Sequence, residues 1–422
     1  MKIPSFYFGI GKKPMEKGEI YKEKEEFKEV HWVLQHAHSG KFYEFSFGMS
    51  DFPNIRIKTI NNLEETGLKF ENNSISGIPM THNLYHLDIE FFHIEDKENT
   101  EIKRVQLLVN VDPKDLWKSI PSDRNSDFYK EDEVSFQGTF SDKKIVVASK
   151  RGRSHAHEGK FREDDFAVTE LASEWNVVSV SDGAGSSVMA REGSRLATVS
   201  INQFLSDPDV LSEIENNINI IYTSGNLQKE LDEAKENVIR LLYKGVLYVH
   251  NTLEKTAAKN NLSINDLHAT LIFALVKKFS FGYVILSFGV GDCPINLINT
   301  DFSEVELLNT MDVGEFSGGT RFMTMKEIFS DHIISRFRIT CVEDFSYLVL
   351  MTDGIYDPKF LTENKLEDTE CWKTFFNDLN GGNDDLAQVD FINDAKVAQQ
   401  LLHWTDFWSR GNHDDRTLAI IY

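Results

Sequence analysis

Cysteine is scarce in this sequence, which contains only Cys293, Cys341 and Cys371 among 422 residues. An odd number of widely spaced cysteines gives neither a disulfide framework nor a zinc-binding spacing, and such usage is typical of a reducing cytosol. No apolar run approaches the roughly 20 residues that a membrane-spanning helix needs. The N-terminus also lacks the apolar core and cleavage site of a signal peptide. These absences predict a cytoplasmic protein.

Basic residues are outnumbered, with 45 Lys and Arg against 67 Asp and Glu, so the formal net charge is −22. Such a surface repels the phosphates of nucleic acids and anionic membranes, which are therefore not expected as partners. The sequence also lacks a Cys-x₅-Arg loop, a Gly-x-Ser-x-Gly elbow and a P-loop. It therefore offers no familiar protein nucleophile or nucleotide cradle.

What the sequence does contain is a recurring arrangement of apolar runs with acidic residues at one end. Isolated Asp-Gly pairs are common in plain turns, but five predicted strands share this arrangement. A common acidic cluster at one edge of a sheet explains the regularity. Oxygen ligands without His or Cys favour Mg²⁺ or Mn²⁺ over zinc. The runs and their acids are 176–181 with Asp182, 347–352 with Asp353, 281–290 with Asp292, 418–422 with Asp414 and Asp415, and 166–168 with Glu163, Asp164 and Asp165.

These motifs, in this order, resemble the metal-dependent protein Ser/Thr phosphatases of the protein phosphatase 2C type, and the bacterial branch in particular. The resemblance covers residues 136–422. It implies an α+β fold in which two packed sheets are flanked by helices, an αββα sandwich. The motifs are Arg151-Gly-Arg-Ser-His155, Glu163-Asp164, Ser181-Asp-Gly-Ala-Gly185, Gly291-Asp292, Thr352-Asp-Gly354 and Asp414-Asp415.

The resemblance also implies a metal centre with two Mn²⁺ or Mg²⁺ ions and a third, more weakly held ion. The ions neutralise the substrate phosphate and activate a bridging water, so no protein nucleophile is needed. Glu163 and Asp164 are expected to act through metal-bound waters, and Asp292 to belong to the third ion. The remaining implied ligands are Asp182, which bridges two ions, the carbonyl of Gly183, Asp353 and Asp414.

A basic residue must also hold the anionic substrate phosphate. Arginine suits this role, because its guanidinium group binds phosphate through two hydrogen bonds. Arg153 is the first candidate, with Arg151 behind it. The spacing to the acidic pair departs from the commonest form of the family, so Lys160 and Arg162 stay open as alternatives.

A proton donor for the leaving alkoxide is less clearly marked. The family often has His or Met after the Asp-Gly pair, whereas this chain has Ala184. His155 is the substitute candidate for the acid. The alternative is that His155 only orders its own loop.

The chain is expected to contain four segments. Residues 1–38 form a charged segment, either a solvated helix or arm or a docking segment. Residues 39–118 form an all-β module with alternating runs, and residues 66–79 resemble a signature of immunoglobulin-like, cadherin-related modules. A linker at 119–135 precedes the catalytic domain, 136–422.

Within the catalytic domain, two long helices are predicted at 188–205 and 227–259, with Ser186 or Ser187 capping the first. Residues 206–226 are predicted to be irregular or mixed, and 384–408 to be largely helical. Residues 312–321 form a glycine-rich loop that either connects strands or faces the substrate through Arg321.

The predicted function is metal-dependent hydrolysis of phosphoserine and phosphothreonine on proteins, and an opposing Ser/Thr kinase is a plausible partner. Two alternatives stay open. One is a non-catalytic protein that keeps the fold and binds a ligand through the β module; retention of Asp182, Asp353 and Asp414 argues against it. The other is a small-molecule phosphatase with the same site.

Overall fold

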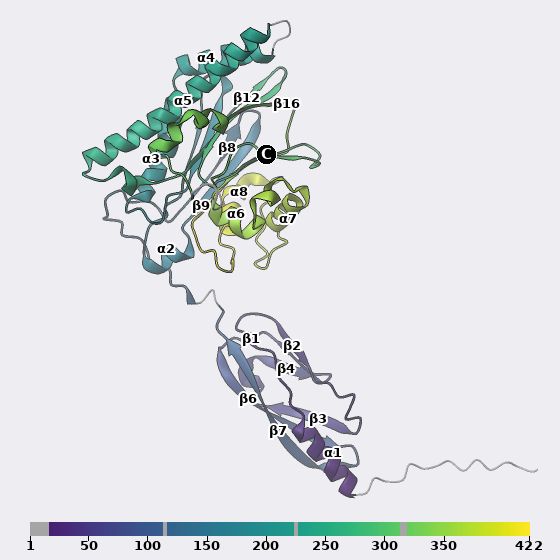
Figure 1. The fold of residues 1–422 in the computed structure, drawn as a ribbon. Helices are drawn as coiled ribbons and strands as arrows, with labels where there is room; N and C mark the ends of the chain where they lie inside the picture. The colour runs from purple at the N-terminus through teal and green to yellow at the C-terminus, as the bar shows by residue number, and fades with distance from the viewer. Residues whose placement is uncertain (1–16, 113–115, 223–226, 313–318) are drawn as a thin grey trace, which may run out of the picture. The chain divides into compact units, whose positions relative to one another are not determined.

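The computed structural model describes residues 17–112, 116–222, 227–312 and 319–422. The chain divides into two compact units, Met1–Leu116 and Trp117–Tyr422 (Figure 1). This division falls earlier than residue 136, where the catalytic domain was expected to begin. Most of the predicted loop 312–321 lies outside the described residues.

The N-terminal unit packs two antiparallel-rich sheets around one apolar core. The strand orders are β1-β7-β6-β3 and β2-β5-β4. Inward-facing residues of β6 and β7 alternate with outward polar ones, as expected of sheets that each bury one face. The elements are α1 (Lys17–Glu29), β1 (Ala37–His38), β2 (Tyr43–Ser46), β3 (Ile55–Asn61), η1 (Glu64–Thr66), β4 (Leu68–Glu71), β5 (Ser74–Gly77), β6 (Asn83–His93) and β7 (Asp96–Asn110).

Helix α1 belongs to the core of this unit rather than to a separate charged arm. Phe27 is fully buried, and its ring packs at a tilt against that of Phe91 of β6, with 4.5 Å between the centroids. Lys103 of β7 is also buried, and its ammonium group donates to the carbonyls of Phe27, Lys28 and Val30 at the end of the helix. A lysine at this position satisfies the carbonyls that a helix C-terminus leaves unpaired.

The second unit contains a five-stranded and a six-stranded sheet. Their strand orders are β10-β11-β12-β13-β16 and β15-β14-β17-β18-β9-β8. The strands are β8 (Glu133–Phe140), β9 (Lys143–Lys150), β10 (Asp165–Glu170), β11 (Asn176–Ser181), β12 (Leu271–Phe279), β13 (Gly282–Val290), β14 (Ile295–Ile298), β15 (Val305–Leu307), β16 (Phe337–Val342), β17 (Tyr347–Met351) and β18 (Arg416–Ile421).

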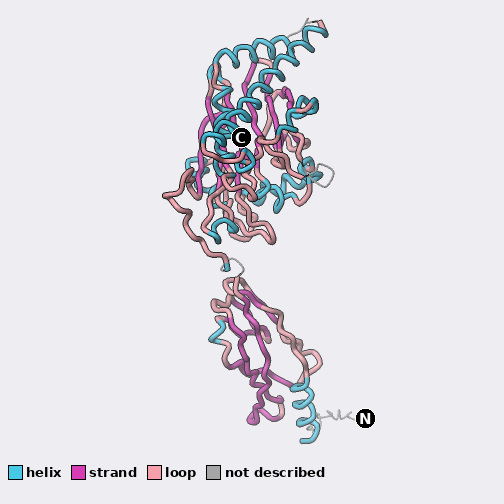
Figure 2. Tube along the Cα trace, turned by 60° about the vertical axis from the view of Figure 1, so that its left-hand side comes forward, coloured by secondary structure: helices cyan, strands magenta, loops and turns pink. Residues whose placement is uncertain are grey.

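Helices cover the outer face of each sheet (Figure 1). One apolar core joins the inner faces of the two sheets, and includes Val147 of β9 and Val178 of β11. A second core lies between the five-stranded sheet and α3, α4 and α5, and a third between the six-stranded sheet and α6, α7 and α8. In Figure 2 the strands of this unit run between helices. The predicted αββα sandwich is therefore confirmed.

Most predicted helices occur, but the helix α4 was not predicted, and the helical part of residues 384–408 is shorter than expected. The α-helices are α2 (Arg153–Glu158), α3 (Ala190–Leu205), α4 (Pro208–Tyr222), α5 (Gln228–Lys259), α6 (Asp353–Phe360), α7 (Thr369–Leu379) and α8 (Val397–Trp404). The short 3₁₀ helices are η3 (Ala172–Glu174), η4 (Ile264–Leu267), η6 (Lys326–Phe329), η7 (Asp331–Arg336), η8 (Glu363–Glu367) and η9 (Asp394–Lys396).

Helix α4 occupies the stretch that was predicted to be irregular. Leu211, Ile214 and Ile218 recur at helical spacing, and all three are buried in the core with α5. Tertiary packing thus outweighs the weak local signal. The predicted helical stretch 384–408 shrinks to α8, preceded by the short η9.

The start of α3 also differs from the prediction. The N-cap residue is Met189, which makes no side-chain capping bond. Ser187 instead donates from its hydroxyl to the carbonyl of Asn265, at 2.8 Å. The serine therefore fixes a neighbouring loop rather than the helix end.

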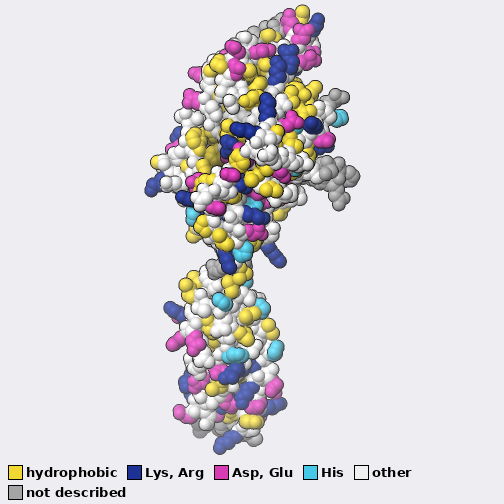
Figure 3. All heavy atoms as spheres, turned by 90° about the vertical axis from the view of Figure 1, so that its left-hand side faces the viewer, with side chains coloured by type: hydrophobic (Ala, Val, Ile, Leu, Met, Phe, Trp, Pro, Cys, Tyr) yellow, Lys and Arg dark blue, Asp and Glu magenta, His cyan; other side chains and the backbone are white. Residues whose placement is uncertain are grey.

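Two surface properties complete the fold. Within the ranges that the structure covers, no helix combines the length and apolar character that crossing a bilayer requires. On the face shown in Figure 3, acidic and basic side chains are interspersed, so the excess of acidic residues is not gathered into one patch there.

Candidate metal centre

The pairing of the strands brings the loops that carry the predicted acidic ligands to one edge of the sandwich. In the five-stranded sheet, Asp165 pairs with Ser181 and Leu271 with Val290, so β11 and β13 end where β10 and β12 begin. In the six-stranded sheet, Met351 pairs with Leu418, so β17 ends where β18 begins. Because the same edge receives all these ends, acids far apart in sequence lie together. We call the set the acidic edge: Glu163, Asp164, Asp182, Asp292, Asp353 and Asp414.

Asp182 lies at the centre of the acidic edge. Burial and the charges of Asp353, Asp164 and Asp414 raise its pKa well above the usual value for aspartate. Its backbone is held on both sides by Thr270: the amide of Asp182 donates to the threonine hydroxyl and the amide of Thr270 donates to the carbonyl of Asp182, each at 2.8 Å. The loop is thus rigid while the carboxyl group experiences strong repulsion.

Asp164 is the most deeply buried acid of the set, with 1% of its surface exposed. Its Oδ2 accepts hydrogen bonds from the hydroxyls of Thr352 and Thr417, each at 2.8 Å. Burial and the charge of Asp415 raise its pKa to about 7. One carboxylate oxygen is therefore fixed by protein donors, which orients the other.

Four acids of the edge have a buried carboxylate oxygen that accepts no hydrogen bond within the described part of the chain. Native proteins rarely leave buried polar atoms unsatisfied, because desolvation without a partner is costly. Several converging oxygens of this kind are the donor set that a hard divalent cation prefers. The residues present therefore fit the metal ions that the resemblance implies. The atoms are Glu163 Oε2, Asp164 Oδ1, Asp292 Oδ1 and Asp353 Oδ1.

The backbone beside Asp182 leaves no room for a side chain. A Cβ on Gly183 would lie 2.7 Å from the carbonyl oxygen of Glu163 and 2.9 Å from that of Ala190. Glycine is therefore required here by close approach of neighbouring backbone. This approach places the loop after β11 directly against the backbone of Glu163.

Asp415 has a role that the sequence analysis missed. It is buried, and its two oxygens accept the backbone amides of Gly152 and Glu163, each at 2.5 Å. Although burial opposes ionisation, the hydrogen bond and charge of His155 hold the pKa of Asp415 below its usual value. Asp415 thus fastens two loops of the site together. The acidic pair Asp414-Asp415 was visible in the sequence, but only its first member had been given a role.

His155, the candidate acid, lies beside the acidic edge. Its Nδ1 is 3.0 Å from Asp415 Oδ1 and its Nε2 is 3.8 Å from Glu163 Oε2. Burial lowers the pKa of the imidazole, but Asp415, Glu163 and Asp414 outweigh it and raise the pKa to about 9. Ligand atoms of His155, Asp414 and Asp415 lie within 4.8 Å of one another. At neutral pH His155 is therefore a cation at the acidic edge.

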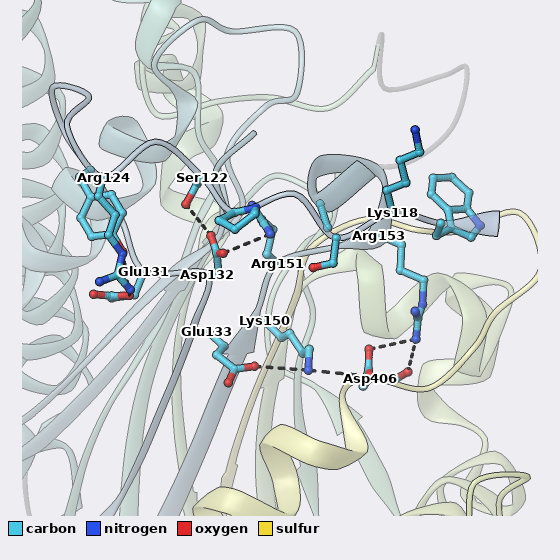
Figure 4. Close-up of a pocket in the computed structure, with 15 residues that line it drawn as sticks. Lys118, Ser122, Arg124, Glu131, Asp132, Glu133, Lys150, Arg151, Arg153 and Asp406 are labelled. Carbon is cyan, nitrogen blue, oxygen red and sulfur yellow. Dashed lines mark hydrogen bonds and ion pairs between the residues drawn. The ribbon is translucent and has the colours of Figure 1, made fainter. Parts of the chain in front are cut away.

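Arg153, the first candidate for the phosphate, is engaged elsewhere in this structure. Its guanidinium donates to the carbonyl of Asp406 at 2.8 Å and to its Oδ1 at 3.0 Å (Figure 4). It also lies 5.7 Å from the ring centroid of Trp408. Arg151 donates to the carbonyl of Lys160 at 2.8 Å and pairs with Asp132 at 3.1 Å. The assignment of Arg153 stays a prediction, and it requires the guanidinium to leave Asp406.

The two alternatives differ sharply in accessibility. Arg162 is 2% exposed and donates to the carbonyls of Glu131 and Asp164. It is therefore part of the protein interior. Lys160 is exposed and pairs with Glu158 at 2.6 Å, so its ammonium group is accessible to a substrate.

Asp292 forms a hydrogen bond with the segment that begins at residue 319, where the described chain resumes. Its Oδ2 accepts the hydroxyl of Thr320 at 2.8 Å, and burial raises its pKa. Arg321 lies 3.8 Å from Asp312, which Arg336 holds with two hydrogen bonds of 2.7 and 3.0 Å. Arg321 is thus near the site, but on the side of Asp292 rather than of His155.

Three comparisons relate this arrangement to known proteins. The sequence model of the protein phosphatase 2C family matches residues 151–400. No curated protein matches the chain. Similar solved structures include the serine/threonine phosphatase Stp1 of Staphylococcus aureus, at 15% identity, covering 67% of this chain and 95% of that one with a TM-score of 0.39. Others are the S. agalactiae serine/threonine phosphatase (13%, 66% and 98%, 0.38) and the catalytic domain of PstP in complex with two manganese ions (14%, 68% and 98%, 0.34).

The matched region begins at Arg151 and contains the acidic loops from Glu163 to Asp353, and it covers more than half of the 422 residues. The chain therefore belongs to the protein phosphatase 2C family of metal-dependent protein phosphatases.

Proposed function

We propose that the protein hydrolyses phosphoserine and phosphothreonine on proteins with the help of Mn²⁺ or Mg²⁺. The observation that carries this proposal is the convergence of acids from both sheets, four of which have a buried oxygen that accepts no hydrogen bond from the described residues. A non-catalytic relative would have no need to maintain so much unfavourable charge at one edge. Membership of a phosphatase family supports the same reaction.

The chain offers a specific set of groups to hold the ions. Asp182, the Gly183 carbonyl, Asp353 and Asp414 would bind two of them, and Glu163 and Asp164 would act through water. Asp292 would serve a third. When bound, such ions neutralise the phosphate and activate the attacking water. The Thr352 and Thr417 hydroxyls orient Asp164 for this role.

His155 would donate the proton that the leaving alkoxide needs. Asp415 forms an ion pair with His155 on the Nδ1 side of the ring, at 3.0 Å, so Nε2 is the nitrogen left to face the substrate. A pKa of about 9 keeps that proton in place near neutral pH. Arg153 would bind the phosphate after releasing Asp406.

The test compares substrates and metals with the purified full-length protein. Phosphopeptides carrying phosphoserine, phosphothreonine or phosphotyrosine and a panel of small phosphate esters are assayed with Mn²⁺, Mg²⁺ or EDTA. We expect hydrolysis of the first two peptides, loss of activity in EDTA and recovery with either metal. Hydrolysis confined to small esters would indicate a small-molecule phosphatase. Metal binding without any hydrolysis would indicate a non-catalytic protein.

The N-terminal unit and the physiological partner are part of the same proposal. We infer that the unit is an immunoglobulin-like module that positions the enzyme on its phosphoprotein, and that a Ser/Thr kinase phosphorylates that protein. Identification of phosphosites that accumulate when the protein is removed, followed by assay of those peptides with and without the unit, tests both inferences.

A further inference from the structure

Residues 117–132, here called the connector, precede the region that the family model matches and pack along the loops of the metal centre. The amide of Ile120 donates to the carbonyl of Ala156 at 2.9 Å. The ring of Trp117 lies 5.4 Å from that of His157 and 4.4 Å from that of His413. The connector therefore contacts both α2 and the segment before Asp414. The sequence analysis had placed residues 119–135 in a linker.

Three arginines from the surrounding loops donate to the connector. Arg151 reaches the carbonyl of Ile120 at 3.0 Å and the carboxylate of Asp132, which Ser122 also contacts (Figure 4). Arg162 donates to the carbonyl of Glu131 at 3.2 Å. Arg191, at the start of α3, donates to the carbonyls of Phe128 and Asp127, each at 3.0 Å. These arginine side chains fix the connector in place.

Among the described residues of the connector, Lys130 is the one whose side chain contacts the acidic pair Glu163-Asp164. Its ammonium group donates to the carbonyl of Asp164 at 2.9 Å and to the hydroxyl of Ser194 at 3.1 Å, and pairs with Asp165 at 2.9 Å. Its side chain is only 6% exposed. The contacts use all three donors of an ammonium group.

These contacts determine where the acidic pair can lie. The carbonyl of Asp164 accepts from both Lys130 and Arg162, and the hydroxyl of Ser194 donates to the carbonyl of Glu163. Both backbone carbonyls of the pair are therefore held. Loss of the ammonium group would leave the largely buried carboxylate of Asp165 without its ion-pair partner, with only the charge of Arg162 to offset it, and such a loss is costly. The backbone would then relax, and the free oxygens of the pair would move with it.

We propose that Lys130 is a positioning residue for the acidic pair Glu163-Asp164, so that the metal centre depends on a residue outside the family-matched region. This inference rests on the proposed metal-dependent function. Lys130 touches no substrate and acts through the backbone of Asp164. Outer groups that orient metal-binding residues typically cost about 10- to 100-fold in metal affinity or activity when removed.

The test uses full-length protein with K130M, K130R and a matched control, K118M, which alters an exposed lysine of the same connector. Mn²⁺ affinity is measured by calorimetry at a temperature where each variant is folded, alongside kcat, KM and metal-free Tm. For K130M we expect Mn²⁺ affinity to fall about 10- to 100-fold, with kcat recovering at high Mn²⁺. K130R should restore most of the affinity, and K118M should match the wild type.

A lower Tm for K130M with unchanged Mn²⁺ affinity in the folded protein would overturn the proposal, because it would show a purely structural role. If K130M does not fold, K130Q, which keeps a hydrogen-bond donor but loses the charge, decides: weakened Mn²⁺ binding with little loss of Tm supports positioning, and wild-type binding contradicts it. A wild-type protein without metal-dependent hydrolysis would instead refute the proposed function. An active wild type with an indistinguishable K130M would refute only the role of Lys130.

Discussion

The two units bury charge in opposite ways. In the N-terminal unit, buried polar and charged side chains meet partners: Lys24 pairs with Asp96 at 2.7 Å, the His93 ring contacts Glu23 at 3.2 Å, and Lys103 donates to carbonyls at the end of α1. In the second unit, the acidic edge gathers like charges, and four of its oxygens accept no hydrogen bond from any residue that the structure describes. The first arrangement stabilises a fold, whereas the second weakens the metal-free protein and prepares it for cations.

The largest effect is expected from Asp182→Asn. Activity should fall by more than the roughly 100-fold typical of outer positions. The metal-free Tm should stay the same or rise, because the substitution removes a charge that Asp353, Asp164 and Asp414 oppose. Steady-state kinetics and thermal unfolding in EDTA measure both, with Asp232→Asn on the exposed face of α5 as control. Wild-type turnover would refute the metal mechanism.

The second comparison is between two truncated proteins. A 117–422 fragment keeps the connector and should hydrolyse a small phosphate ester. A 136–422 fragment loses Lys130, Glu131 and Asp132, and with them the contacts to Asp164, Arg162 and Arg151. It should be much less active or insoluble. Equal activity of the two fragments would show that the domain begins near residue 136, as the sequence alone predicts.

Arg153→Ala should have an intermediate effect. Loss of a charge-assisted hydrogen bond costs about 1.5–3 kcal/mol, or roughly 10- to 150-fold in kcat/KM. Mn²⁺ affinity should not change, because the arginine is paired with Asp406 rather than with the acidic edge. Arg124 is an exposed arginine that lines the same surface pocket as Arg153 (Figure 4). Kinetics and calorimetry on Arg153→Ala and on the control Arg124→Ala test the assignment. Unaltered kinetics would redirect attention to Lys160.

Lys103→Met tests the other side of the comparison. It leaves carbonyls at the end of α1 without a donor, which should lower the unfolding free energy of the N-terminal unit by about 1–3 kcal/mol. Hydrolysis of a small ester should be unaffected. Lys58→Met, which breaks an exposed pair with Glu90, should change little. Calorimetric unfolding separates these outcomes, and a loss of catalysis in Lys103→Met would contradict the independence of the two units.

The smallest effect concerns pH. Burial raises the pKa values of Glu163 and Asp164 to about 7 in the metal-free folded protein. Because these values exceed those of the unfolded chain, metal-free stability should fall as pH rises from about 4 to 7. Mn²⁺ needs the ionised groups, so its affinity should rise over the upper part of this range and then level off. Thermal unfolding with and without Mn²⁺ at pH 5 to 8 checks both trends.

Much of this arrangement could be predicted from the sequence, because strand ends followed by Asp-Gly are local signals. A mixed α and β domain with a shared acidic cluster at one sheet edge follows from them, and the αββα class follows from the family resemblance that the motifs carry. The helix α4 was missed because Leu211, Ile214 and Ile218 gain their stability from α5. Asp415 and Lys130 were missed because their roles consist of contacts to backbone that is distant in sequence. No local pattern encodes such contacts.

The central claim is that the acidic edge binds at least two cations. A crystal structure of the full chain grown with Mn²⁺, with anomalous data at the manganese edge, tests it most directly. The account predicts at least two strong anomalous peaks within about 2.0–2.6 Å of oxygens of Asp182, Asp353 or Asp414. Peaks confined to other surfaces, with the acidic edge empty at saturating Mn²⁺, would contradict it.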